Sequence, residues 1–108
     1  NVSTYHRLQI PQDRTVETVP GVEISRRWSP LKRVGAYVPG GKDAYPSTLI
    51  MTVAPARLAG VEEEVLMSPA GPDGEVSTTL LAAAALLEVD EMYFAGGAQG
   101  VAALAYGT

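Results

Sequence analysis

The chain has 108 residues, of which 46% are hydrophobic, and a formal net charge of −4 at pH 7. This length and hydrophobic share are typical of one domain with a packed core. The lack of cysteine excludes disulfides and thiolate metal sites, and a single histidine, His6, excludes a multi-histidine metal cluster within these residues.

The patterns of apolar and charged residues argue against membrane-spanning or secreted proteins and against nucleic-acid-binding proteins. No run approaches the roughly 18 to 20 apolar residues that cross a bilayer, and the N-terminal residues lack the apolar core of a signal peptide. A cytoplasmic protein without membrane contact is therefore expected. The basic residues are scattered in an acidic chain and lack interleaved aromatics, which argues against nucleic-acid binding.

Residues 1–32 are expected to form an N-terminal helix and a β-hairpin. Helical spacing over residues 2–10 gives way to a period of two between residues 14 and 30, with Pro20-Gly21 as the turn signal. Trp28 is expected to close the hairpin against the core, although its ring could instead stack on a ligand.

Residues 33–38 form the first of three predicted strands. Alternate residues from Val34 to Val38 would share one face, with Gly35 and Tyr37 on the other. Both faces are apolar enough to be covered, which is typical of an inner strand of a parallel sheet.

A proline and two glycines end this strand. Pro39 has no amide hydrogen for a sheet ladder. Gly40 and Gly41 can take backbone angles closed to other residues, and they let a ligand approach the main chain. A plain strand-to-helix turn is the alternative.

Helical and strand patterns alternate through the rest of the chain. The expected elements are a helix from Pro46 to Gly60 with a kink or break at Pro55, a strand over 62–68, a helix capped by Ser77 or Thr78, a strand over 89–95, and a short helix that begins at Gly96-Gly97. This order predicts an α/β fold in which residues 33–108 form a Rossmann-like parallel sheet with flanking helices. Three strands leave exposed edges, so the domain is expected to be incomplete.

Both glycine pairs fall at the carboxyl edge of the predicted sheet, where open parallel sheets bind ligands and helix N-termini carry a partial positive charge. Tyr37 offers a ring and a hydroxyl there, and the amide of Gln99 can both donate and accept hydrogen bonds. These features predict a nucleotide or phosphate site, although the Gly-x-Gly-x-x-Gly and P-loop motifs are absent. The alternatives are a Tyr37 buried in the core and a Gln99 that caps its helix.

Several stretches together resemble histidinol dehydrogenase, and nearly the whole chain is covered in that family's order and spacing. They are the stretches at residues 33–41, 44–48, 55–61, 96–99 and 102–108. The resemblance implies an NAD-dependent, zinc-containing, homodimeric enzyme that oxidises L-histidinol to L-histidine in two hydride transfers. A non-catalytic α/β nucleotide-binding or assembly module, and a structural domain without a ligand, are the alternative functions.

The resemblance also assigns roles to individual residues. In that family the tyrosine before the Pro-Gly-Gly turn and the glutamine of Gly-Gly-Ala-Gln contact the dinucleotide, and these correspond to Tyr37 and Gln99, with the turn itself at residues 39–41. The family's zinc ligands, histidinol-binding groups and general base lie beyond Thr108. The resemblance therefore assigns no catalytic or metal residue to this chain, and implies an internal piece of the enzyme that is inactive alone. Glu88 stands where the family commonly has a helix-ending glycine, which leaves the end of that helix open.

Overall fold

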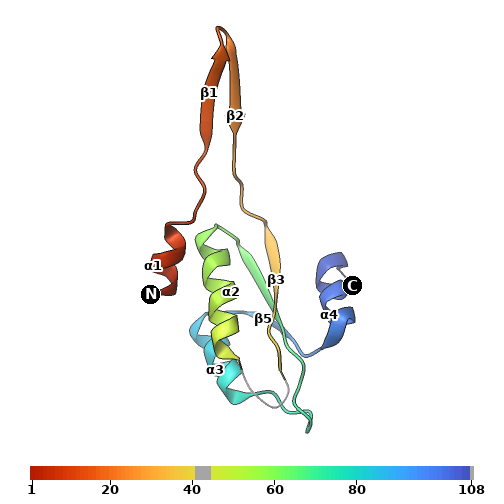
Figure 1. Ribbon diagram of the computed structural model, residues 1–108. Coiled ribbons are helices and arrows are strands. Elements are labelled where there is room, and N and C mark those ends of the chain that lie inside the picture. The colour runs from red at the N-terminus through yellow and green to blue at the C-terminus, as the bar shows by residue number, and fades with distance from the viewer. Residues whose placement is uncertain (41–44, 108) are drawn as a thin grey trace.

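A three-stranded parallel sheet with helices on both faces carries a long antiparallel hairpin at one end (Figure 1). The structure, a computed structural model, describes residues 1–40 and 45–107. Its elements are α1 (Val2–Arg7), β1 (Arg14–Val19), β2 (Val22–Arg26), β3 (Arg33–Tyr37), α2 (Pro46–Leu58), β4 (Glu63–Met67), α3 (Thr78–Leu86), β5 (Glu91–Tyr93) and α4 (Gly97–Tyr106). The expected fold class, α/β with a parallel sheet preceded by a helix and a hairpin, is confirmed.

The strand order in the sheet is β3-β4-β5, with β4 in the middle. Tyr37 at the end of β3 pairs with Met67 at the end of β4, which in turn pairs with Tyr93 at the end of β5. The carboxyl ends of the three strands are therefore level at one edge. No described strand pairs with the outer side of β3, so the expectation that β3 is an inner strand is wrong for the described part of the chain.

The core lies between the sheet and the helices α2 and α3, while α4 lies on the opposite face (Figure 1). Val38, Leu49 and Leu66 are fully buried in this core. On the other face, a Cβ atom at Gly35 would lie 2.9 Å from a methyl carbon of Leu104, so α4 rests directly on the backbone of β3. Both faces of β3 are thus covered, as its apolar pattern predicts.

Helix α2 continues through Pro55, so the expected break in the helix does not occur. A proline at this position leaves the carbonyl of Met51 without its helical partner. Met51 lies on the water side of the helix, with 62% of its surface exposed, where solvent can satisfy that carbonyl.

Helix α3 ends cleanly at Glu88, which settles the end that the sequence analysis left open. Glu88 takes the left-handed conformation with a φ of 52°. Its N–H donates to the Ala85 carbonyl and that of Val89 donates to the Ala84 carbonyl, each at 3.0 Å. These two bonds form a Schellman motif. Arg57 adds a 3.0 Å bond from Nη2 to the Glu88 carbonyl, which ties the end of α3 to α2.

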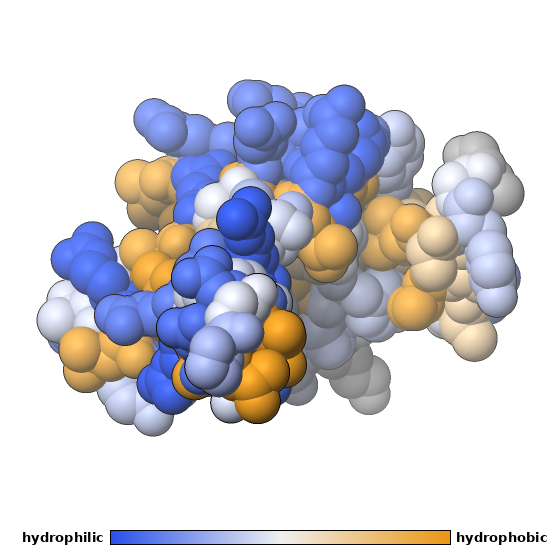
Figure 2. Space-filling view, turned by 90° about the horizontal axis from the view of Figure 1, so that it is seen from above, coloured by the Kyte–Doolittle hydropathy of each residue, from blue (hydrophilic) through white to orange (hydrophobic). Residues whose placement is uncertain are grey.

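Every residue of β1 and β2 is exposed. Looking down on the hairpin, Figure 2 shows hydrophobic residues at the surface beside hydrophilic ones. Trp28 is 54% exposed and lines a cavity of about 430 Å³ with residues of α1 and the end of α2, including His6 and Leu58. The expectation that Trp28 closes the hairpin against the core is therefore wrong, because the hairpin points away from the sheet.

Candidate functional site

Two glycine turns meet at the carboxyl edge of the sheet, one after β3 and one after β5. Between them lies Pro69, which follows β4. A Cβ atom at Gly40 would lie 2.4 Å from the Pro69 carbonyl oxygen, and one at Gly96 would lie 2.8 Å from the Pro69 Cβ. Neither position has room for a side chain, so both turns pack against Pro69 at the same edge of the sheet, and the sequence predicts that shared edge.

The hydroxyl of Tyr37 reaches the start of α4. The backbone N–H of Gly97 donates a hydrogen bond to the Tyr37 oxygen at 3.3 Å. Because the oxygen acts as acceptor here, the hydroxyl proton remains free to donate to another group. Tyr37 is half-buried rather than enclosed in the core, so the alternative of a core tyrosine does not describe it.

Gln99 lies in the first turn of α4 and is exposed. No side chain caps the start of α4, so Gln99 is not the helix cap that the alternative required. Its side chain folds over Gly97, where a Cβ atom would lie 2.6 Å from Oε1. Gly97 has a φ of 77°, which glycine adopts without strain. Tyr37 and Gln99 therefore meet at the same glycine.

The other predicted site residues lie beside this contact. Pro39 and Gly40 are exposed at the edge, whereas Gly41 lies outside the described residues and its role stays a prediction. The helices α2, α3 and α4 follow β3, β4 and β5, respectively, so all three present their N-termini near this edge (Figure 1). The free N–H groups and partial positive charge of such N-termini favour an anionic ligand.

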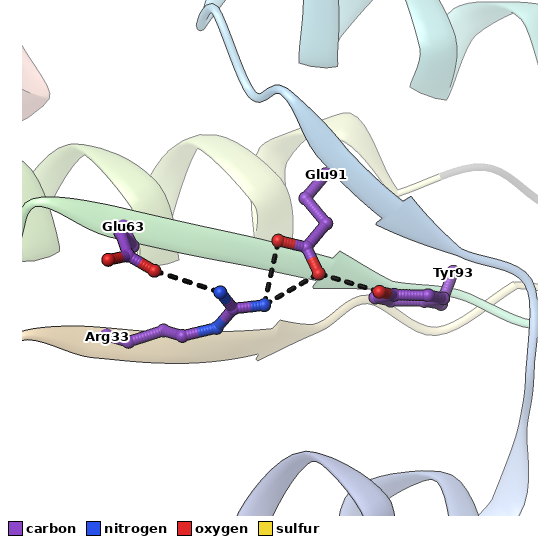
Figure 3. Close-up of polar contacts among 4 residues, drawn as sticks. All are labelled: Arg33, Glu63, Glu91 and Tyr93. Atoms are coloured by element: carbon purple, nitrogen blue, oxygen red, sulfur yellow. Dashed lines mark hydrogen bonds and ion pairs between the residues drawn. The ribbon is translucent and has the colours of Figure 1, made fainter. Parts of the chain in front are cut away.

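A second polar cluster, which the sequence analysis missed, joins the three strands on the face toward α4 (Figure 3). Arg33 donates to Glu63 at 2.9 Å and to Glu91 at 2.6 Å. The hydroxyl of Tyr93 donates to Glu91 at 2.7 Å. The signal in the sequence is that Arg33, Glu63 and Glu91 each begin a strand, so a parallel register brings them together.

Each member of this cluster perturbs the ionisation of its neighbours. The hydrogen bond from Tyr93, with the positive charge of Arg33, lowers the pKa of Glu91. The same hydrogen bond raises the pKa of Tyr93. Glu63 and Glu91 together raise the pKa of Arg33. Arg33, Glu91 and Tyr93 line a cleft of about 530 Å³ between the sheet and α4.

Within residues 1–40 and 45–107, no three His, Cys, Asp or Glu side chains come together as metal ligands. None of the described helices is both long enough and apolar enough to cross a membrane.

Comparisons with known proteins give one consistent result. Residues 1–108 match the family model for histidinol dehydrogenase. The chain is 48% identical over 107 residues to the histidinol dehydrogenase of Prochlorococcus marinus (strain MIT 9313), covering 99% of this chain and 24% of the relative. It is 47% identical over 108 residues to that of Methanothermobacter thermautotrophicus, covering 100% of this chain and 25% of the relative.

A solved structure agrees with the sequence relatives. The crystal structure of histidinol dehydrogenase from Elizabethkingia anophelis superposes with a TM-score of 0.87 at 33% identity, over 99% of this chain and 25% of that protein. The chain thus spans about a quarter of the length of the relatives it matches.

Proposed function

The chain belongs to the histidinol dehydrogenase family, and on that premise we propose that it supplies NAD contacts in an enzyme that oxidises L-histidinol to L-histidine. The observation that supports this proposal most strongly is the meeting of Tyr37 and Gln99 over Gly97, beside the turn at Gly40. Tyr37 and Gln99 lie at the carboxyl edge of a parallel sheet, where open sheets of this kind bind dinucleotides.

The residues present fit this ligand by their chemistry. The ring of Tyr37 offers an apolar surface for a base or ribose, and its hydroxyl has a proton free to donate. The amide of Gln99 can donate and accept, which matches the hydroxyls of a ribose. The Gly97 N–H already donates to Tyr37, and the next N–H groups at the start of α4 suit the pyrophosphate. The bound NAD would accept the hydride, while these residues bind and orient it.

The rest of the proposed activity belongs to the part of the protein outside this chain. The described residues do not fit a zinc ion, because no three metal-ligating side chains come together among them. We therefore propose that the zinc ligands, the histidinol-binding groups and the general base come from the remaining three quarters of the enzyme's length. We also propose that the full-length enzyme is a homodimer and lies in the cytoplasm.

Titration of NAD into the full-length protein tests the proposed contacts. Replacing Tyr37→Phe removes the hydroxyl alone, and Gln99→Ala removes the amide. Each substitution should weaken NAD binding by about three- to ten-fold, the effect of losing one or two hydrogen bonds. Isothermal titration calorimetry measures the dissociation constant directly.

Tyr106→Phe is the matched control, since Tyr106 is 87% exposed at the far end of the same helix. It should leave NAD binding unchanged. If the wild-type protein binds NAD and neither Tyr37→Phe nor Gln99→Ala weakens that binding, the dinucleotide lies elsewhere. Wild-type protein that binds no NAD would instead favour a non-catalytic module.

A further inference from the structure

Helix α4 packs on the sheet at two points where a glycine faces a long side chain. A Cβ atom at Gly35 of β3 would lie 2.9 Å from a methyl carbon of Leu104. A Cβ atom at Gly100 of α4 would lie 2.7 Å from the Sδ of Met67. Gly100 and Leu104 are four residues apart and therefore lie on the same face of the helix. The two contacts together fix how α4 lies on the sheet.

Met67 occupies the centre of the sheet face that α4 covers. It ends the middle strand, β4, and is 5% exposed. By the alternation of the strand it faces α4, whereas Leu66 faces the core beneath α2 and α3. It pairs with Tyr37 on one side and with Tyr93 on the other. Met67 therefore lies beside the tyrosine whose hydroxyl contacts the start of α4.

Gly100 has no side chain because of packing and not because of backbone conformation. It lies inside α4 and is buried, with ordinary helical geometry, and glycine is less favourable than alanine in a helix interior. The Met67 sulfur takes the place of a Cβ atom at this position, whereas the backbone C and O of Ala95 lie at an ordinary distance of 3.8 Å. The Met67 side chain on the bare Gly100 backbone thus sets the spacing between β4 and α4.

This spacing bears directly on the two proposed NAD contacts. Gln99 immediately precedes Gly100, so the two residues move together with the first turn of the helix. The bond from the Gly97 N–H to the Tyr37 hydroxyl is 3.3 Å, at the long end for such bonds. A small outward shift of α4 would break this bond and carry Gln99 away from Tyr37.

We propose that Met67 is a positioning residue for the dinucleotide, which acts through Gly100 to hold Gln99 at the distance from Tyr37 that NAD requires. This inference rests on the proposed function, and it adds a size-matched pair of residues that do not themselves touch the ligand.

Gly100→Ala in the full-length protein tests the pair from the side of the helix. The added methyl group overlaps the Met67 sulfur and pushes the first turn of α4 outward. NAD binding should weaken by about three- to ten-fold, the effect of losing one or two hydrogen bonds. The KM for NAD should rise accordingly, while the KM for histidinol should not change. Calorimetry and steady-state kinetics measure these quantities.

The same substitution in a Met67→Val background is the matched control. Valine ends at its γ carbons, so it leaves the position of the sulfur empty, and Gly100→Ala then has room for its methyl group. The double variant Met67→Val/Gly100→Ala should bind NAD within about two-fold of wild type. Such a rescue is a coupling between two residues in contact. A general effect of alanine on the helix would be equal in both backgrounds.

The outcomes separate this inference from the proposed function. Unchanged NAD affinity in Gly100→Ala, whatever its melting temperature, would show that Met67 moves aside without effect on the ligand. An equal loss of affinity in both backgrounds would show that Gly100→Ala does not act through Met67. Either result overturns the inference while wild-type NAD binding leaves the proposed function intact.

If Gly100→Ala alone does not fold, the double variant decides. It should fold and bind NAD within about two-fold of wild type, and failure to do so overturns the inference. Absence of NAD binding by the wild-type protein would overturn the proposed function itself.

Discussion

The hairpin and the parallel sheet contain the same kinds of strand residues, yet only the sheet has a core. In the sheet, Leu66 is fully buried beneath α2 and α3. In the hairpin, Val16 and Ile24 pair directly across the strands, but each is more than half exposed. An alternating pattern thus predicts a strand, whereas burial depends on whether the chain supplies something to cover its apolar face.

The hairpin also carries features that disfavour it alone in water. Its register places Arg14 opposite Arg26 and Glu17 opposite Glu23, and like charges in such pairs repel. An isolated two-stranded hairpin is marginally stable. The chain exposes 7840 Å², whereas a compact protein of this mass exposes roughly 5,700 Å². We expect the hairpin to be covered in the full-length protein.

The largest expected difference between the sheet and the hairpin is in the stability lost when one apolar side chain is truncated in each. Leu66→Ala should destabilise the 108-residue chain by about 2–5 kcal/mol, because it leaves a cavity in the core. Ile24→Ala should cost less than about 1 kcal/mol, because an exposed side chain loses little contact. Urea unfolding of both variants measures the difference.

The same pair of substitutions in the full-length protein sharpens this contrast. If the hairpin is covered there, Ile24→Ala should become more costly while Leu66→Ala changes little. Equal costs for the two substitutions in the 108-residue chain would contradict the separation into a packed and an unpacked region.

A smaller effect is expected at Glu88, within the packed region. Its left-handed backbone is strained for any residue with a Cβ atom. Glu88→Gly should therefore raise the free energy of unfolding by about 0.5–1 kcal/mol. This is the net effect, because the relief of strain is partly offset by the greater flexibility of glycine in the unfolded chain. The counterpart at the turn of the hairpin, Gly21→Ala, should be destabilising because Gly21 has a φ of 82°. A loss of stability in Glu88→Gly would mean that the Glu88 side chain makes contacts that outweigh the strain.

The smallest effect is a pH dependence confined to the sheet. Tyr93 and Arg33 lower the pKa of Glu91 in the folded protein. The ionised Glu91 therefore contributes fully to the stability of the fold above its usual pKa of about 4.5, and this contribution is lost as the pH falls through the lowered pKa of the folded state. Glu91→Gln should reduce the loss of stability on acidification. Thermal melts from neutral to acidic pH measure it, and an identical pH profile in wild type and Glu91→Gln would contradict the role of this carboxylate.

The sequence predicted the parts of the fold that depend on local signals. Pro46 and Ser77 mark the starts of two helices, and Pro20-Gly21 marks the hairpin turn. The break that was one expectation at Pro55 does not occur, because the cost of a lost hydrogen bond depends on whether the freed carbonyl faces water. The predicted burial of Trp28 against the core was wrong, because its burial depends on the direction of the hairpin, which no local pattern encodes.

The candidate site divides in the same way. The glycine pairs and Tyr37 follow from the ends of predicted parallel strands, so their meeting at one edge could be expected. The position of Pro69 between the two turns depends on the register of β4 between its neighbours. Such three-strand contacts have no signature in a single sequence.

A crystal structure of the full-length protein with bound NAD tests the central claim most directly. We predict that the dinucleotide lies across the turns at Gly40 and Gly97, in contact with Tyr37 and Gln99. A dinucleotide bound away from this edge, with both side chains remote from it, would contradict the account.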